Sequence, residues 1–221
     1  MDLTQFTPSS ALVTVVVLAM APFVAVMVTS FTKIVVVLSL LRNALGLQQV
    51  PPNVVLNGMA IVLTVYVMFP VGQQMGERIS GIEGLGTSTQ SMLTAGDRAK
   101  EPLREFLVRH SHARERAFFL RTAQKSLPAE KAAQLTDRDF IVVLPAFTVS
   151  ELSAAFQIGF LIFLPFLVVD LVVSNILMSM GMQMLTPTTV SLPFKLLLFV
   201  LVDGWVKLAH GLVLSYHSAG G

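Results

Sequence analysis

The sequence predicts an all-α, membrane-type protein built from two long, kinked helical hairpins that flank a small helical insert. Three observations support this class. The 221 residues are 54% hydrophobic and only 13% charged, whereas soluble domains carry about 25% charged residues. Four long apolar stretches are separated by turn signals. Of 15 basic and 13 acidic residues, 20 lie in the segment from Glu77 to Asp139, so the charge is concentrated in the insert.

The first hairpin is expected over residues 1–71. Its two apolar stretches are Ala11–Leu41 and Val54–Val71, and the second has about the 20 residues that a helix needs to cross a bilayer. Between them, Gly46 lies where a helix C-cap is expected, and the Pro51–Pro52 pair lies where the next helix would begin. These signals predict a tight turn between two antiparallel helices.

The polar insert is expected over residues 72–139. Its first part, GERISGIEGLGTSTQSMLTAGD, is rich in Gly, Ser and Thr and predicts a loop with at most a short helix. The second part predicts a helix that has Pro102 in its first turn. One face of that helix repeats apolar residues at the i, i+3, i+4, i+7 spacing of a buried stripe, formed by Leu103, Phe106, Leu107 and His110.

The second hairpin is expected over residues 140–221, with apolar stretches Phe140–Met178 and Val190–Leu214. A helix of nearly forty residues would extend roughly 60 Å, about twice the thickness of the bilayer core. Prolines should therefore break or kink the helices, or much of the longer one leaves the lipid. The expected break points are Pro165 and Pro193 within the stretches and Gly181 and Pro187 at the turn between them.

The distribution of basic residues predicts an orientation in the membrane. Within short loops, Lys33, Arg42 and Lys195 fall on one side, and the opposite short ends have none. By the positive-inside bias, both hairpin tips face the cytoplasm and the insert faces outward. The N-terminal MDLTQFTPSS has no Lys or Arg before the first apolar run. We therefore interpret that run as a retained helix and not as a signal peptide.

Composition and motifs exclude several functions. The net charge of +2 is too small for a nucleic-acid surface, which needs clustered Lys and Arg. The absence of Cys removes disulfides, thiolate nucleophiles and Cys-ligated metals. The sequence has no HExxH, GxSxG or P-loop motif, and its four His residues lack further ligands at metal-site spacing. We therefore expect no catalytic residue, no metal and no cofactor.

A run of alternate methionines lies at the turn of the second hairpin, in MSMGMQMLTP. Residues at every second position cannot form one stripe on a helix, but they align along one edge of an extended loop. Gly181 would permit the chain to leave the helix there. Methionine is unbranched and refills irregular gaps, which suits a deformable seal. The alternative is that these side chains fill space in a hydrophobic hairpin. The run consists of Met178, Met180, Met182 and Met184.

Isolated charges interrupt the apolar stretches, where an ionisable group costs roughly 2.5 to 3.5 kcal/mol on insertion scales. Asp203 and Lys207 are spaced i, i+4 with the acid first, so we expect them to pair within one helix. Glu151, Asp170 and Lys195 have no local partner. We expect them to bridge helices or adjacent subunits and so to fix the assembly. A proton relay of carboxylates is the alternative.

Five ordered segments together resemble the FliP/SctR family, the export-gate proteins of type III secretion systems. They are FTKIVVVLSLLRNALGLQQVPPN, EPLREFLVRH, LPAFTVSELSAAFQIGF, FLPFLVVDLVV and LPFKLLLFVLVDGW, and they span nearly the whole chain. The turn reads Gly-Met-Gln-Met where the flagellar branch typically reads Gly-Met-Met-Met. This departure and the missing leader peptide look more like the virulence, or injectisome, branch.

The resemblance implies a protein without enzymatic activity in the bacterial inner membrane. It implies a helical pentameric ring that assembles with two smaller hydrophobic subunit families and with larger export-apparatus proteins. Unfolded secreted substrates would pass through this channel. Much of the apolar surface would then pack against neighbouring subunits, lifted partly out of the bilayer, with the insert in the periplasm. The family assigns a pore-sealing gasket to Met182, Gln183 and Met184, with Met180 as a weaker candidate.

Two other functions are open from the sequence. An ion-coupled transporter would use Glu151 and Asp170 as coupling groups, although such proteins typically show internal repeats and the two hairpins share no obvious symmetry. A scaffold that holds partner membrane proteins without conducting anything would be indifferent to the methionines of the loop.

Overall fold

The computed structural model describes residues 8–80, 89–182 and 184–217. Within these residues the chain forms nine helices and no strand, which confirms the all-α class. The helices are α1 Pro8–Met27, α2 Phe31–Ala44, α3 Asn53–Ser80, α4 Thr89–His110, α5 Ala113–Ser126, α6 Ala129–Gln134, α7 Phe140–Ser179, α8 Pro187–Leu201 and α9 Gly204–His217.

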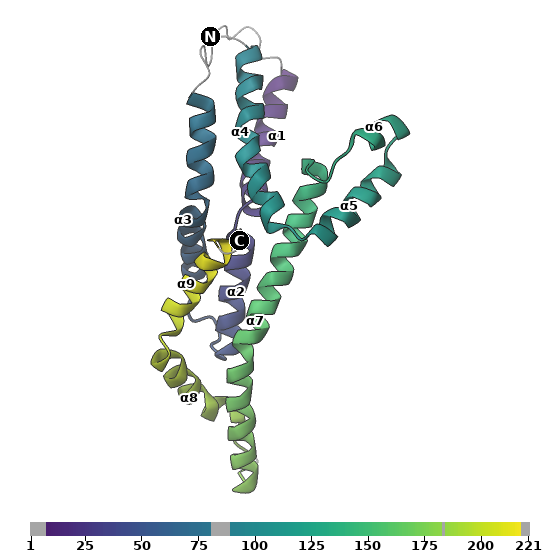
Figure 1. Ribbon diagram of the computed structural model, residues 1–221. Helices are drawn as coiled ribbons and strands as arrows, with labels where there is room; N and C mark the ends of the chain where they lie inside the picture. Colours follow the sequence, from purple (N-terminus) through teal and green to yellow (C-terminus); the bar gives the residue numbers. More distant parts are fainter. Residues whose placement is uncertain (1–7, 81–88, 183, 218–221) are drawn as a thin grey trace.

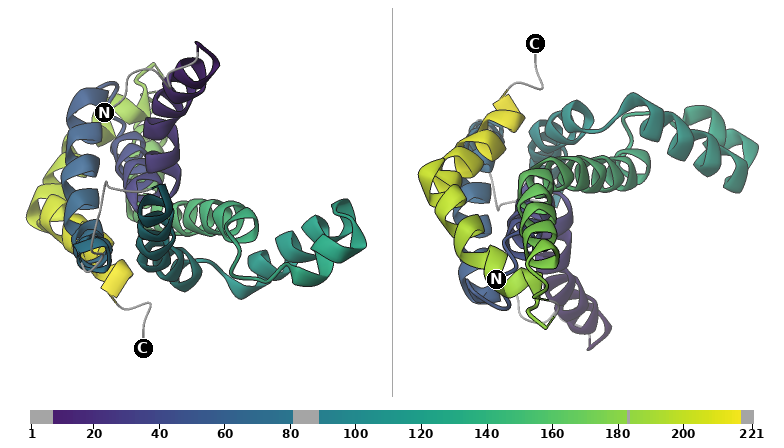
Figure 2. Two further views of the ribbon diagram at one scale, coloured as in Figure 1. Left: turned by 90° about the horizontal axis from the view of Figure 1, so that it is seen from above. Right: turned by 90° about the horizontal axis from the view of Figure 1, so that it is seen from below.

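The molecule is elongated, and α7 runs along most of its length (Figure 1). Helix α2 packs along α7 and α3 lies on the other side of α2, and the end of α7 forms one extremity. At the other end α4 lies against α3, while α5 and α6 form an arm that projects away from the bundle (Figure 1). The views from above and below show the same arm (Figure 2). We name α5 and α6 the arm.

The first hairpin turns as predicted at Gly46, which has a φ of 75°. The Gly46 N–H donates to Asn43 O at 3.0 Å, and the Leu47 N–H donates to Arg42 O at 3.3 Å. This pair of bonds is a Schellman motif, which satisfies the last carbonyl groups of α2. The Arg42 guanidinium also donates to the Asn53 side chain at 2.6 Å, so it links the end of α2 to the start of α3.

The first apolar stretch is not one straight helix. The chain bends by 71° between the end of α1 and α2. Side chains satisfy carbonyl groups that the bend frees, since Thr29 Oγ1 donates to Ala25 O and Thr32 Oγ1 donates to Val26 O. No proline or glycine lies at this bend, so sequence signals did not predict it.

The insert contains more helix than the sequence predicts. Helix α3 continues to Ser80 and α4 begins at Thr89, so most of the expected loop is helical. Pro102 lies in the interior of α4 and not in its first turn. Contact of α4 with α3 and α7 outweighs the weak helix propensity of these residues. The predicted buried face is confirmed at Phe106 and Leu107.

In the second hairpin, two expected helix breaks are absent. Helix α7 is continuous through Pro165, and α8 is continuous through Pro193. A proline removes one backbone hydrogen bond, and packing of α7 against α2 and of α8 against α7 maintains both helices. The bend of 59° falls instead between α8 and α9, where Asp203 has a φ of 53°. Gly204 follows, and a Cβ there would lie 2.0 Å from the Phe199 ring.

The core is centred on α2, whose inward face is fully buried between α3 and α7. Close approach of α2 and α7 depends on Gly159, because a Cβ there would lie 2.2 Å from Leu40 Cδ1. The outer faces of the helices expose many large apolar side chains. In the described part of the chain, α3 and α7 are each long and apolar enough to cross a membrane. Up to four spans result if each bent pair counts as one.

Candidate pore loop and buried ion pairs

The turn between α7 and α8 begins at Gly181, which has a φ of 72°. The Gly181 N–H donates to Met178 O at 3.1 Å, and the Met182 N–H donates to Leu177 O at 3.0 Å. This is the same Schellman motif that ends α2. Pro187 is the first residue of α8. Gly181 and Pro187 therefore lie at the helix ends, as predicted, and the turn between them is short.

The four methionines do not share one extended edge. Met178 lies within α7, and Met180 is its C-cap with helical dihedral angles, so the expected alignment is wrong for these two residues. Met182 and Met184 lie beyond the helix, and Gln183 lies outside the described residues. The Met184 side chain is fully exposed in this chain, and Met182 is 43% exposed. The turn thus presents soft apolar side chains at the extremity of the molecule.

A buried ion pair joins α2 to α7. Lys33 Nζ lies 3.1 Å from Glu151 Oε1, and both side chains are almost fully buried. The Tyr216 hydroxyl donates to the other Glu151 oxygen, and the Lys33 ammonium lies 3.6 Å from the centre of the Tyr216 ring. Each charge therefore has more than one partner, as a desolvated ion pair requires. The cluster fixes α2, α7 and α9 relative to one another.

A second pair joins α7 to α8. Lys195 Nζ lies 2.6 Å from Asp170 Oδ2 and donates to Ala44 O at 3.3 Å. Ser191 Oγ donates to Asp170 Oδ1 at 2.5 Å. Ala44 is the last residue of α2, where a cation interacts favourably with unpaired carbonyl groups. One ammonium group thus stabilises the contact of three helices.

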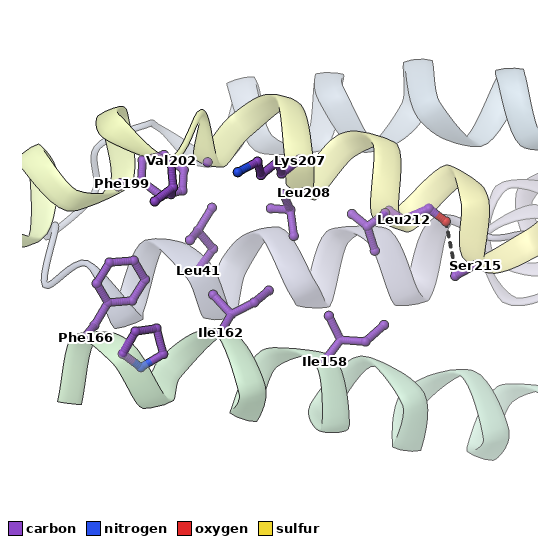
Figure 3. Close-up of a pocket in the computed structure, with 13 residues that line it drawn as sticks. Leu41, Ile158, Ile162, Phe166, Phe199, Val202, Lys207, Leu208, Leu212 and Ser215 are labelled. Carbon is purple, nitrogen blue, oxygen red and sulfur yellow. Dashed lines mark hydrogen bonds between the residues drawn. The ribbon is translucent and has the colours of Figure 1, made fainter. Parts of the chain in front are cut away.

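The expected pair between Asp203 and Lys207 is not formed among the described residues. The Lys207 N–H donates to Asp203 O at 3.0 Å, but Asp203 lies in the bend before α9 with a left-handed φ, so its side chain leaves the helix face on which an i, i+4 pair forms. Both residues are exposed. Lys207 lines an apolar pocket of about 540 Å³ between α2, α7 and α9, and its amine lies near Val202 (Figure 3).

Two contributors to these clusters were not predicted from the sequence. Lys33 was interpreted as an orientation signal, although it is the partner of Glu151, and Tyr216 was not among the residues singled out from the sequence. Tyr216 also stacks on Phe106 of the insert with ring centroids 6.1 Å apart, and its carbonyl lies 3.3 Å from His110 Nε2. The sequence does carry one signal for these clusters. Each hairpin has a lysine in an apolar stretch, Lys33 or Lys195, with no acidic residue three or four positions away.

Comparisons with known proteins agree with this organisation. The model of the FliP family matches residues 14–212. The hypersensitivity response secretion protein HrcR of Ralstonia nicotianae is 54% identical, over 94% of this chain and 97% of its own length. Yop proteins translocation protein R of Yersinia pestis is 52% identical, over 90% of this chain and 92% of its own.

A flagellar relative is more distant than these two. The flagellar biosynthetic protein FliP of Bacillus subtilis is 42% identical, over 90% of this chain and 88% of its own length. The similarity to both groups extends along nearly the whole chain, and it is greater for the two proteins named above for virulence-associated secretion. The chain therefore belongs to the FliP family, on its virulence-associated branch.

Proposed function

We propose that this protein is a channel-forming export-gate subunit of a type III secretion system in the bacterial inner membrane. It assembles as a homopentamer with two smaller hydrophobic subunit families and with larger export-apparatus proteins. Unfolded secreted proteins pass through the assembly. At rest, the loop with Met182, Gln183 and Met184 closes the pore.

The observation that carries this proposal is the exposure of Met184 and Met182 on a short turn at the end of a 40-residue helix. A methionine that filled space in the hairpin would be buried between α7 and α8. Exposed at the extremity, these flexible thioethers suit a ring of five loops that seals against ions and deforms around a polypeptide. Met180 lies one residue before the turn and is a weaker contributor.

The exposed apolar surface supports assembly with other subunits. Large apolar side chains are exposed along α3, α7 and α8, and contiguous patches of this kind mark protein or lipid contacts. Within the assembly we place the hairpin tips toward the cytoplasm and the insert in the periplasm, with part of the helices lifted out of the bilayer. The basic residue Arg42, in the last turn of α2 at the first hairpin tip, supports this orientation, whereas Lys33 and Lys195 are held in buried ion pairs.

The charged residues fit a structural role better than a proton relay. Glu151 has Lys33 and Tyr216 as partners, and Asp170 has Lys195 and Ser191. A coupling carboxylate must change its protonation, which two donors at each carboxylate oppose. Asp203 and Lys207, which form no ion pair with a described residue, are the charges that we assign to contacts between subunits. The two buried pairs position the surfaces that assemble.

A stalled substrate tests the pore directly. We would place a photo-cross-linking amino acid at position 183 and stall export with a substrate fused to a tightly folded domain. A cross-link between position 183 and the unfolded segment of the substrate is the expected result. A cross-linker at Phe118, on the arm, serves as the control position. If the substrate stalls but cross-links neither to position 183 nor to position 118, the proposal that the loop faces the channel lumen is refuted.

A further inference from the structure

Helix α5 of the arm carries an exposed basic face. Arg114, Phe118, Arg121 and Lys125 are spaced i, i+4, i+7 and i+11, so they share one side of the helix. All four are exposed. We name this set the arm face. It spans about 16 Å from end to end, which matches about three helical turns or five residues of an extended strand.

The orientation of the arm face is fixed by a fourth basic residue, which lies on another side of α5. Arg116 donates to Val108 O at 3.0 Å and to Ser111 O at 2.7 Å, and its Nε lies 3.5 Å from Asp137. The His112 N–H donates to Ser150 Oγ on α7 at 2.9 Å. These bonds hold the base of the arm, so the arm face is presented in a defined direction.

The cations of the arm face have almost no acidic partners in this chain. Arg114 lies 3.8 Å from its neighbour Glu115, and its side chain is 94% exposed. Arg121 and Lys125 form no ion pair with any residue in the described ranges. The arm face thus presents three cations around one aromatic ring without local neutralisation.

Helix α4 of a second copy does not offer a matching surface. The acidic residues of α4 repeat at i, i+4, i+8, but each already has a basic partner within the chain. Asp97 pairs with Lys100, Glu101 with Arg104 and Arg138, and Glu105 with Arg78. Docking α4 of a neighbour on the arm face would therefore exchange existing ion pairs for new ones.

A membrane surface also fits poorly. A helix that lies in the lipid interface presents a broad apolar face, whereas Phe118 is the one large apolar side chain that α5 exposes. The other large apolar residues of α5, Phe119 and Leu120, are half-buried, and α5 contacts α6 and α7. An aromatic ring flanked by Arg side chains is instead typical of a binding hot spot in a protein–protein interface.

We propose that the arm face, Arg114, Phe118, Arg121 and Lys125, docks an acidic segment of a different protein of the same assembly. The three cations pair with Asp or Glu side chains, and the Phe118 ring contacts an apolar side chain between them. This inference concerns the outward arm and does not depend on the pore loop. It rests on the proposed place of this protein in a multi-subunit assembly, and failure of the pore loop alone would leave it standing.

The test uses the full chain in living cells. Phe118 is replaced by p-benzoylphenylalanine, and the cross-linked peptides are identified by mass spectrometry. We expect one dominant adduct, on an Asp- and Glu-rich segment of another polypeptide. Arg121→Glu with Lys125→Glu should lower the adduct at least tenfold. The matched control is Arg98→Glu with Lys131→Glu, which changes the charge equally on exposed residues away from the arm face and should keep the adduct within twofold.

Immunoblots check that each variant accumulates, and Arg121→Gln with Lys125→Gln replaces the reversal if that variant does not. An adduct on lipid, on a second copy of this chain or on a segment without acidic residues would overturn the proposal. So would an adduct that is equally strong in both charge-reversal variants, or the absence of any adduct.

Discussion

Lys33 Nζ lies 3.1 Å from Glu151 Oε1, although 118 residues separate the two side chains in sequence. The pair joins the first hairpin to the second at a buried position. Because neither charge contacts bulk water, each depends on the other for its stability. This relationship makes the pair a sensitive test of how the two hairpins are held together.

Removing one partner of the Lys33–Glu151 pair should destabilise the protein. Glu151→Gln leaves a buried ammonium group without its counter-charge, for which we expect a loss of about 3 to 5 kcal/mol. Thermal unfolding of the purified protein in detergent measures this loss of stability. The double variant Lys33→Met with Glu151→Gln should recover much of the stability, because no buried charge remains. Equal stability of the Glu151→Gln variant and the parent would contradict a structural ion pair.

The same Glu151→Gln variant separates the two candidate functions. An ion-coupled transporter requires the carboxylate, so flux in reconstituted vesicles would be abolished even where the protein is folded. A channel subunit predicts no ion-coupled flux in the parent to begin with. Proton-coupled flux in the parent that Glu151→Gln eliminates would favour the transporter.

Reversing the charge at position 170 should disrupt assembly. Asp170→Lys places an ammonium group beside Lys195, where 2.6 Å now separates opposite charges, and the repulsion should move α8 away from α7 and α2. We expect the pentamer band on native gels to be lost. The exchange variant Asp170→Lys with Lys195→Asp restores opposite charges and should recover part of it. Unchanged complex size for Asp170→Lys would remove this role.

Shortening the loop methionines should make the resting channel leak. In Met182→Ala with Met184→Ala, the proposed ring loses two exposed thioethers per subunit, while both residues lie outside the helices. Assembly should be intact, and overproduced complex should admit small ions, measured as conductance. Met178→Ala is the matched control, because Met178 is also an exposed methionine but lies within α7. Conductance equal to the parent in the double variant would count against the gasket.

Replacing Gly181 should weaken the end of α7 without a steric clash. A Cβ at Gly181 meets no atom within 4 Å, but the φ of 72° is unfavourable for alanine, so Gly181→Ala should cost roughly 1 to 2 kcal/mol. Gly58→Ala, within α3 and equally open, should instead stabilise by about 0.5 to 1 kcal/mol. Thermal unfolding compares the two. A Gly181→Ala variant as stable as the parent would show that the Schellman turn is not required.

Local signals predicted the ends of helices well. Gly46, Gly181 and Pro187 all lie where their conformational preferences placed them, because a left-handed residue or an N1 proline depends only on its immediate neighbours. The FliP family was also recognisable from ordered motifs. The gasket role proposed for Met182, Gln183 and Met184 rests on that resemblance, and the alignment expected for the methionine run is wrong at Met178 and Met180, which are helical.

Features that depend on distant contacts could not be predicted. Pro165 does not break α7, because packing on α2 supports the helix around it. The Asp203–Lys207 pair failed for a related reason, since the bend before α9 takes Asp203 out of helical geometry. Lys33 and Glu151 are neighbours only after both hairpins have folded. No spacing rule connects residues so far apart.

The two fixed ends of the methionine turn limit how far it can travel. The Met182 N–H is tied to Leu177, and α8 resumes at Pro187, so only the backbone from 182 to 186 can swing. Even fully stretched, five residues reach no more than about 17 Å. In the proposed ring of five such turns, movement of the turns alone would open a path for one extended polypeptide. A folded domain would require whole helices to separate, so this short turn is consistent with the proposed passage of unfolded proteins.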